Sequence, residues 1–217
     1  GSVDLSKETK LTSSNYISIS GSPKDMCNIT SIENFKWGFQ DDIIINGADY
    51  PNLETINKYA FEGGEGNITF KGKFKSLKEI LYSAFYYVKG NITFTKCSFP
   101  KLTTFGGWGS TYGDITFKKC SFPEITTISE RAFESALGNI TFTNNRFPKL
   151  TQFNKNSFFG ISKEETDITF TKNDFPKLTT ISDFAFKNAR GNISFVENNF
   201  PKLTTISERA FESVFGN

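Results

Sequence analysis

The stretch ITFTKNDFPKLTTISDFAF, from Ile168 to Phe186, decides the fold, because close copies of it recur along the 217 residues. Two copies share the string TTISERAFES, at 126–135 and at 204–213. A fixed internal period is typical of a solenoid, in which each unit stacks on the next. An isoleucine opens each copy, with spacings of 23 to 28 residues, at Ile17, Ile43, Ile68, Ile92, Ile115, Ile140, Ile168 and Ile193.

Each unit begins with the pattern of a strand and then changes period. Ile140 and Phe142 alternate with threonines, as in a strand with one buried face. From Leu178 the apolar residues follow L-x-x-I-x-x-x-A-F, which mixes steps of three and four and predicts a short helical or 3-10 segment. We therefore expect a curved, right-handed solenoid with eight strands in one parallel sheet.

Stacking of the units places most of the 25 phenylalanines in three columns. One column holds the second inward position of the strand, one the turn after the strand, and one the predicted helix. We interpret these columns as the core of the solenoid, in preference to an aromatic cage for a ligand. The regular array is predicted for residues 42–217. Residues 1–41 hold a Gly1-Ser2 typical of a cloning remnant, a tail and a divergent first repeat.

Composition argues against several classes of function. The net charge of +2 predicts no nucleic-acid partner, and the absence of histidine removes the commonest general base and metal ligand. No P-loop, G-x-S-x-G, H-E-x-x-H or EF-hand pattern occurs. No apolar run approaches the roughly 18 residues of a membrane span. We expect a protein that is not an enzyme and that has no metal, cofactor or membrane span.

The phrase I-x-F-x-x-N-x-F resembles the strand segment of the leucine-rich repeat, L-x-L-x-x-N/C-x-L, and the continuation resembles the BspA-like subclass. Members of that subclass look like adhesins and matrix-binding proteins on the surfaces of bacteria and some parasitic protists. The resemblance implies an α/β solenoid of about eight units with a parallel concave sheet, short helical or 3-10 convex segments, and a cell-surface or secreted location. It weakens at Ile68, where the unit is short, and at 105–113, where FGGWGSTYG predicts an irregular convex side.

Cys97 and Cys120 hold the slot that asparagine fills in later units, as at Asn145 and Asn173. The resemblance implies that this slot faces inward and satisfies backbone groups of the turn. We expect two adjacent, buried, structural thiols; a disulfide, and metal or redox chemistry, are the alternatives. Cys27 lies outside this column, and we expect it to be buried.

Four N-x-S/T sequons fall on the position that opens the strand, and a fifth lies at Asn28. Aspartates occupy the same position in other units, so we interpret the column as polar turn residues, with glycosylation as the alternative. The four are Asn67, Asn91, Asn139 and Asn192.

The candidate site is the outward face of the parallel sheet, where the units from Ile68 to Ile168 present threonines and five lysines without an acidic residue. A solvated hydroxyl surface is one interpretation, because threonine favours strands. A polar, locally basic groove is the other. The candidate residues are Thr69, Lys71, Thr93, Thr95, Lys96, Thr116, Lys118, Lys119, Thr141, Thr143, Asn144, Thr169, Thr171 and Lys172.

Our leading hypothesis is a non-enzymatic recognition or adhesion module that binds a protein or an anionic glycan on this face. The alternatives are a spacer within a longer array and, from T-x-T pairs such as Thr93/Thr95, an ice-binding solenoid. The unit that ends at Asn217 has no successor, so we expect it to fray after Phe200 or to pair end to end with another copy. If the sheet binds nothing, the convex side around Trp108 becomes the candidate.

Overall fold

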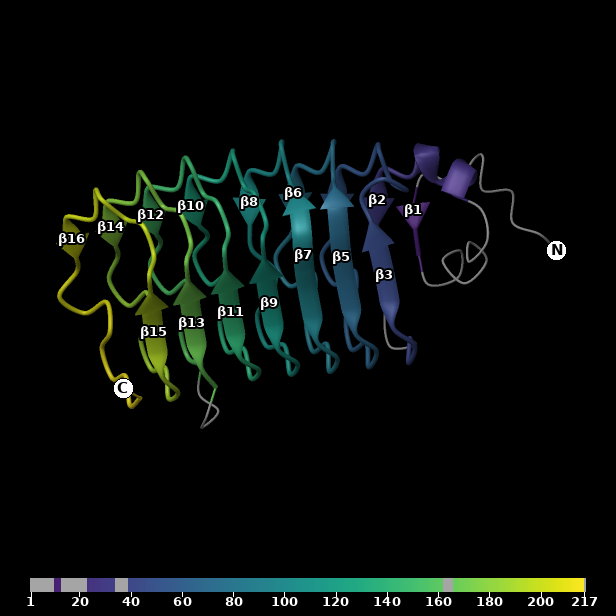
Figure 1. Cartoon of the computed structure of the whole chain (residues 1–217). Helices are drawn as coiled ribbons and strands as arrows, with labels where there is room; N and C mark the ends of the chain where they lie inside the picture. Colours follow the sequence, from purple (N-terminus) through teal and green to yellow (C-terminus); the bar gives the residue numbers. More distant parts are fainter. Residues whose placement is uncertain (1–9, 13–22, 34–38, 162–165, 217) are drawn as a thin grey trace.

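The chain forms a parallel β-solenoid of about seven turns, which we call coils (Figure 1). The computed structural model describes residues 10–12, 23–33, 39–161 and 166–216. The coils stack along one axis, so β1 (Lys10–Leu11) and β16 (Thr205–Ile206) lie at opposite ends of the described part of the molecule (Figure 1). The strand expected at Ile17 lies outside the described residues.

One wall of the solenoid is a seven-stranded sheet, here called the broad sheet. Its strands pair in parallel and in register, so that Ile140 lies opposite Ile115 on one side and Ile168 on the other. The alternation of apolar residues and threonines thus predicted these strands correctly. They are β3 (Ile43–Asn46), β5 (Ile68–Lys73), β7 (Ile92–Ser98), β9 (Ile115–Lys118), β11 (Ile140–Thr143), β13 (Ile168–Thr171) and β15 (Ile193–Val196).

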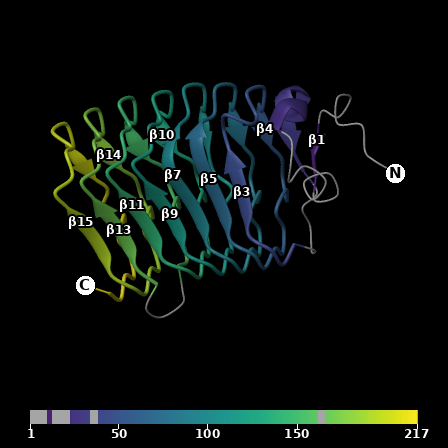
Figure 2. The same cartoon turned by 45° about the vertical axis from the view of Figure 1, so that its right-hand side comes forward.

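A second wall lies behind the broad sheet and consists of two-residue strands in two further parallel sheets (Figure 2). The expectation of a single sheet was therefore wrong. One of these sheets has five strands: β1 (Lys10–Leu11), β2 (Ser31–Ile32), β4 (Thr55–Ile56), β6 (Glu79–Ile80) and β8 (Thr104–Phe105). The other has four: β10 (Thr127–Ile128), β12 (Gln152–Phe153), β14 (Thr180–Ile181) and β16 (Thr205–Ile206).

The segments that follow β4, β6, β10, β12, β14 and β16 consist of tight turns, as does the less regular stretch after β8, and the prediction of convex helices was wrong. We call these stretches turn segments; the one after β10 is residues 129–136. Arg131 and Ser135 have φ values of 58° and 57°, which a right-handed helix does not allow. The Phe133 amide donates to the Ser157 carbonyl of the next coil at 2.8 Å. A helix would satisfy that amide internally, whereas here it joins two coils.

Helix is nearly absent from the described residues: the 3-10 helix η3 (Pro23–Asn28) is the one helical element among them. The α/β class is therefore not supported, and the chain is a β-solenoid at this level of description. The curvature and the right-handed winding stay predictions.

The core consists of three columns of stacked aromatic rings, as the sequence predicted. Ring centroids are 4.6 to 4.9 Å apart from Phe70 to Phe195 in the strand column. They are 4.7 to 5.3 Å apart from Phe74 to Phe175 in the column of the following turn. These values match the spacing of paired strands, about 4.8 Å, so ring stacking and strand pairing share one repeat distance.

The stretch 105–113 keeps the third aromatic column intact. Trp108 is fully buried and stacks between Phe85, at 6.1 Å, and Phe133, at 5.1 Å. Gly107 permits this packing, because its φ is 111° and an added Cβ would lie 2.6 Å from the Leu81 carbonyl oxygen. Trp108 is thus a core residue, and its side chain is not accessible to a ligand.

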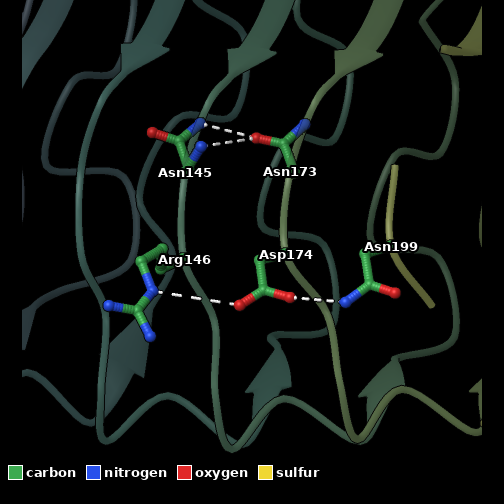
Figure 3. Close-up of polar contacts among 5 residues, drawn as sticks. All are labelled: Asn145, Arg146, Asn173, Asp174 and Asn199. Atoms are coloured by element: carbon green, nitrogen blue, oxygen red, sulfur yellow. Dashed lines mark hydrogen bonds and ion pairs between the residues drawn. The ribbon is translucent and has the colours of Figure 1, made fainter. Parts of the chain in front are cut away.

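A largely buried polar ladder closes the turns after β7, β9, β11, β13 and β15, and Figure 3 draws two of its members, Asn145 and Asn173. The Asn173 side-chain amide donates to the Phe142 carbonyl at 2.9 Å, and its Oδ1 accepts from the Asn145 backbone amide at 2.9 Å. The Asn145 side-chain amide donates to the Phe117 carbonyl in the same way, also at 2.9 Å. Each asparagine therefore satisfies two backbone groups of the preceding coil at once, one acceptor and one donor.

The two cysteines of this ladder are buried, free and adjacent, as predicted. The Cys97 thiol donates to the Phe70 carbonyl at 3.2 Å, and the Cys120 thiol to the Phe94 carbonyl at 3.4 Å. The neighbouring Cys120 side chain, together with burial, raises the pKa of Cys97. Cys27 is exposed, so the expectation of its burial was wrong; it lies within η3, outside the coil core.

A second, exposed ladder runs along the positions that open the strands. The Asn91 backbone amide donates to Oδ1 of Asn67 at 2.9 Å, and the Asp114 backbone amide donates to Oδ1 of Asn91, also at 2.9 Å. Asp42, Asp114, Asn139 and Asp167 accept in the same way from the next coil. This confirms the structural interpretation of the column, in which aspartate and asparagine are interchangeable as acceptors.

Candidate binding face

The structure brings all fourteen predicted site residues onto the outer face of the broad sheet. Within β7, Thr93 and Thr95 are partly exposed while Phe94 between them is fully buried. The parallel register then aligns equivalent residues across strands, so that Thr116, Thr141 and Thr169 are direct neighbours. Period-two alternation and in-register pairing thus produce continuous rows of outward side chains.

The fifth residue counted from the isoleucine that opens each unit has left-handed backbone geometry in the six units from β5 to β15. Lys96, Lys119 and Lys172 have φ values between 52° and 56° and are exposed. Gly72 and Asn144 occupy the same position, where glycine and asparagine are the residues that tolerate positive φ best. Lysine is the costlier choice for the backbone, so folding does not require lysine at this position.

An open hollow of about 430 Å³ spans three neighbouring coils on this face, those of β3, β5 and β7. It arises from a bulge: Lys71 pairs with Thr95 but Gly72 pairs with Cys97, which leaves Lys96 without a partner strand residue. Two lysines, an amide and a hydroxyl thus surround one concave space. Its lining residues are Asn46, Lys71, Gly72, Thr95 and Lys96.

The lysines around the centre of the face are not neutralised by acidic neighbours. Within the residues that the structure describes, Lys71, Lys96, Lys118 and Lys119 take part in no ion pair. Lys172, nearer the end, lies 3.4 Å from a carboxylate oxygen of Glu197. The positive charge is therefore concentrated over β5, β7 and β9, where an anionic group gains most from it.

Sequence reasoning missed one feature of this face and one on the turn segments. Asn46 and Gly72 line the hollow, yet the bulge that forms it appears only when the coils of different length are stacked. Exposed tyrosines on the turn segments were also missed. Their signal was available in the sequence, since Tyr82, Tyr86 and Tyr87 stand where other units carry charged or small residues.

Other kinds of site find little support in the described part of the chain. It contains no group of three or more histidine, cysteine, aspartate or glutamate side chains that could hold a metal ion. No helix in the described ranges has the length and apolar character to cross a bilayer. At the last coil an apolar hollow of about 160 Å³ is lined by Phe195, Leu203 and Ile206 among others. Association through that end stays a prediction.

Comparisons with protein-family models, with curated proteins and with solved structures gave no match. Fold and surface chemistry are therefore the basis for a functional proposal.

Proposed function

We propose that this protein is a non-enzymatic recognition module that binds an anionic ligand on the outer face of the broad sheet. The observation that carries the proposal is the set of exposed lysines at left-handed positions beside the hollow. Lys96 and Lys119 occupy backbone geometry that glycine or asparagine would adopt at lower cost. Their charge therefore serves a purpose other than folding.

The ligand that suits this face carries several negative charges along an extended chain. Lysines recur from coil to coil, about 4.8 Å apart along the axis, and threonine hydroxyls lie between them. A sulfated or sialylated glycan fits this pattern, and so does an acidic protein segment. Lysine binds such groups as a point charge on a flexible stem, which tolerates variation in the ligand.

The strand half of each unit is compatible with a leucine-rich repeat, and we propose this relationship at the level of the strand and its asparagine slot. The tandem turns on the opposite side depart from the helical segments that the BspA-like resemblance implies. Adhesion at a cell surface is the setting that the resemblance favours, with a spacer role in a longer array as the second candidate.

The test is binding of heparin, a sulfated glycan, to the wild-type chain and to a charge-reversed variant. In the variant, Lys71, Lys96, Lys118 and Lys119 are changed to glutamate. We expect wild-type binding that weakens as salt is raised, and loss of binding in the variant. An acidic peptide tested in parallel distinguishes the two ligand classes.

A matched control has the same change of charge elsewhere on the surface. Lys75, Lys101, Lys177 and Lys202 are exposed and lie after the strands, outside the candidate face. Changing these four to glutamate should leave most of the binding intact. If both variants lose affinity equally, net charge explains the binding and the proposed face is wrong.

A further inference from the structure

Five tyrosines gather on the turn segments of neighbouring coils, away from the broad sheet; we call them the tyrosine patch. Tyr82 and Tyr112 are 53% and 49% exposed. The rings contact one another in sequence: Tyr59–Tyr86 at 5.9 Å, Tyr86–Tyr87 at 4.0 Å and Tyr87–Tyr112 at 5.9 Å between centroids. A hydrogen bond to Tyr87 raises the pKa of Tyr86 to about 12, so the Tyr86 hydroxyl stays protonated.

Folding does not demand these tyrosines. Tyr87 has a φ value of 57°, at the position where Gly63 and Gly160 show that glycine suffices, and Tyr59 has a φ value of 56°, at a position that Ser83 and Arg131 hold in other coils. The buried Ala-Phe pair of each turn segment allows the segments to be aligned. In the turn segment that follows β10, the residues equivalent to Tyr82, Tyr86 and Tyr87 are Glu130, Glu134 and Ser135. A cluster of aromatic rings that costs backbone strain and remains exposed is typical of an interface.

A cationic cluster occupies the same side of the coils farther along the chain. Phe184, itself at φ 58°, is surrounded by three cations: the Lys187 and Arg209 groups lie 4.5 Å from its ring centroid, and Lys155 lies 5.4 Å away. Glu212 accepts from Lys187 at 2.6 Å within the same cluster. These four residues, Lys155, Phe184, Lys187 and Arg209, are the cationic cluster.

The two clusters lie symmetrically about one coil. The tyrosine patch belongs to the turn segments that follow β4, β6 and β8, and the cationic cluster to those that follow β12, β14 and β16. The single turn segment between them follows β10. Because the coil spacing is nearly constant, a two-fold axis through that central segment carries each cluster of one molecule onto the other cluster of a second molecule.

We propose that two copies of the chain associate face to face and antiparallel through their turn segments, each tyrosine patch covering the other copy's cationic cluster. Tyr59 then meets Arg209, Tyr82 and Tyr86 meet the coil of Lys187, and Tyr112 meets Lys155. Tyrosine rings attract lysine and arginine through the negative face of the ring. Tyrosine hydroxyls donate to carboxylates such as Glu212.

Sedimentation velocity of the 217-residue chain across a wide concentration range tests this association. We expect a monomer–dimer equilibrium that closes at the dimer. The first variant carries Tyr82→Glu, Tyr86→Glu and Tyr87→Ser, which reproduces the surface of the β10 turn segment and so preserves folding. The second carries Lys155→Glu, Lys187→Gln and Arg209→Asn. Each should raise the dimer dissociation constant about tenfold or more, as the loss of several cation–π contacts predicts.

Mixing the two variants distinguishes loss of the proposed contacts from a general loss of solubility or folding. In a homodimer of either variant, both contacts between a tyrosine patch and a cationic cluster contain an altered partner. In a mixed dimer, the unaltered tyrosine patch of the second variant meets the unaltered cationic cluster of the first, so one of the two contacts is intact. The equimolar mixture should therefore associate more strongly than either variant alone. As a control, Lys71→Gln, Lys118→Gln and Lys172→Gln on the broad sheet should leave the dimer unchanged. A wild-type chain that stays monomeric, polymers that grow with concentration, or a mixture no stronger than its components would overturn the proposal.

Discussion

Replacing Asn173 by alanine removes the central member of the buried ladder drawn in Figure 3. The change leaves the Phe142 carbonyl without its side-chain donor and the Asn145 backbone amide without its acceptor. Each unsatisfied buried group costs about 1–3 kcal/mol, so we expect Asn173→Ala to lower the free energy of unfolding by about 3 kcal/mol.

The cysteine units supply a graded control for the same slot. The Cys120 thiol donates to the Phe94 carbonyl and accepts from the Cys97 backbone amide, so it fills both roles of the asparagine with a weaker group. Asn173→Cys should therefore cost only about 1 kcal/mol. Asn199→Ala removes an exposed hydrogen bond to Asp174 between the coils of β13 and β15, and its effect should stay within about 0.5 kcal/mol.

The assay is urea unfolding followed by circular dichroism and by tryptophan fluorescence. Coincident transitions are required before free energies are compared, because long repeat arrays do not always unfold in one step. A loss below about 1 kcal/mol in Asn173→Ala, or an equal loss in the alanine and cysteine variants, would show that the ladder does not act through backbone satisfaction.

Three further outcomes follow from the core and the surface. Trp108→Ala should cost about 3–5 kcal/mol by urea unfolding, whereas Trp108→Phe should cost far less, because phenylalanine fills this column elsewhere and the buried indole N–H has no partner within the described residues. Native alkylation should label exposed Cys27 rapidly and Cys97 only on unfolding, because burial and a raised pKa suppress its thiolate; equal rates would contradict this. Changing Lys71, Lys96, Lys118 and Lys119 to glutamate should shift the melting temperature by a few degrees at most, since exposed substitutions cost about 0.5 kcal/mol or less each; a calorimetric shift well beyond that would assign these lysines a structural role.

The strands and columns were predictable because strand geometry leaves a simple trace in the sequence. Inward residues recur every second position, and stacking repeats them in every unit. The turn segments were misread because two successive tight turns place Ala132, Phe133 and Ala136 inward with steps of three and four, which a helix also produces. Residues with left-handed backbone geometry distinguish a pair of tight turns from a helix. Here these residues are arginine, serine, tyrosine and phenylalanine as often as glycine, so their types did not indicate turns.

The candidate face was predictable for the same reason as the strands, and its fourteen residues do lie together. The hollow was not, because it depends on a bulge between the coils of β5 and β7, whose lengths differ by one residue before the turn. The exposed tyrosines were overlooked once their segment was assigned to a solvated helix face. In such repeats, a position where one unit carries a residue type that the other units lack is therefore the signal of a functional surface.

The hydrogen bonds between coils have a mechanical consequence. The broad sheet and the short strands are held together by backbone hydrogen bonds between neighbouring coils, and the turn segments add further hydrogen bonds of the same kind. Tension along the stacking axis therefore pulls on one contact between coils after another (Figure 1). Such a rod opens from an end, one coil at a time. Each step frees about 25 residues, or roughly 85 Å of extended chain. A molecule held at both ends would lengthen in even increments while the remaining coils stay folded, which makes it an extensible tether.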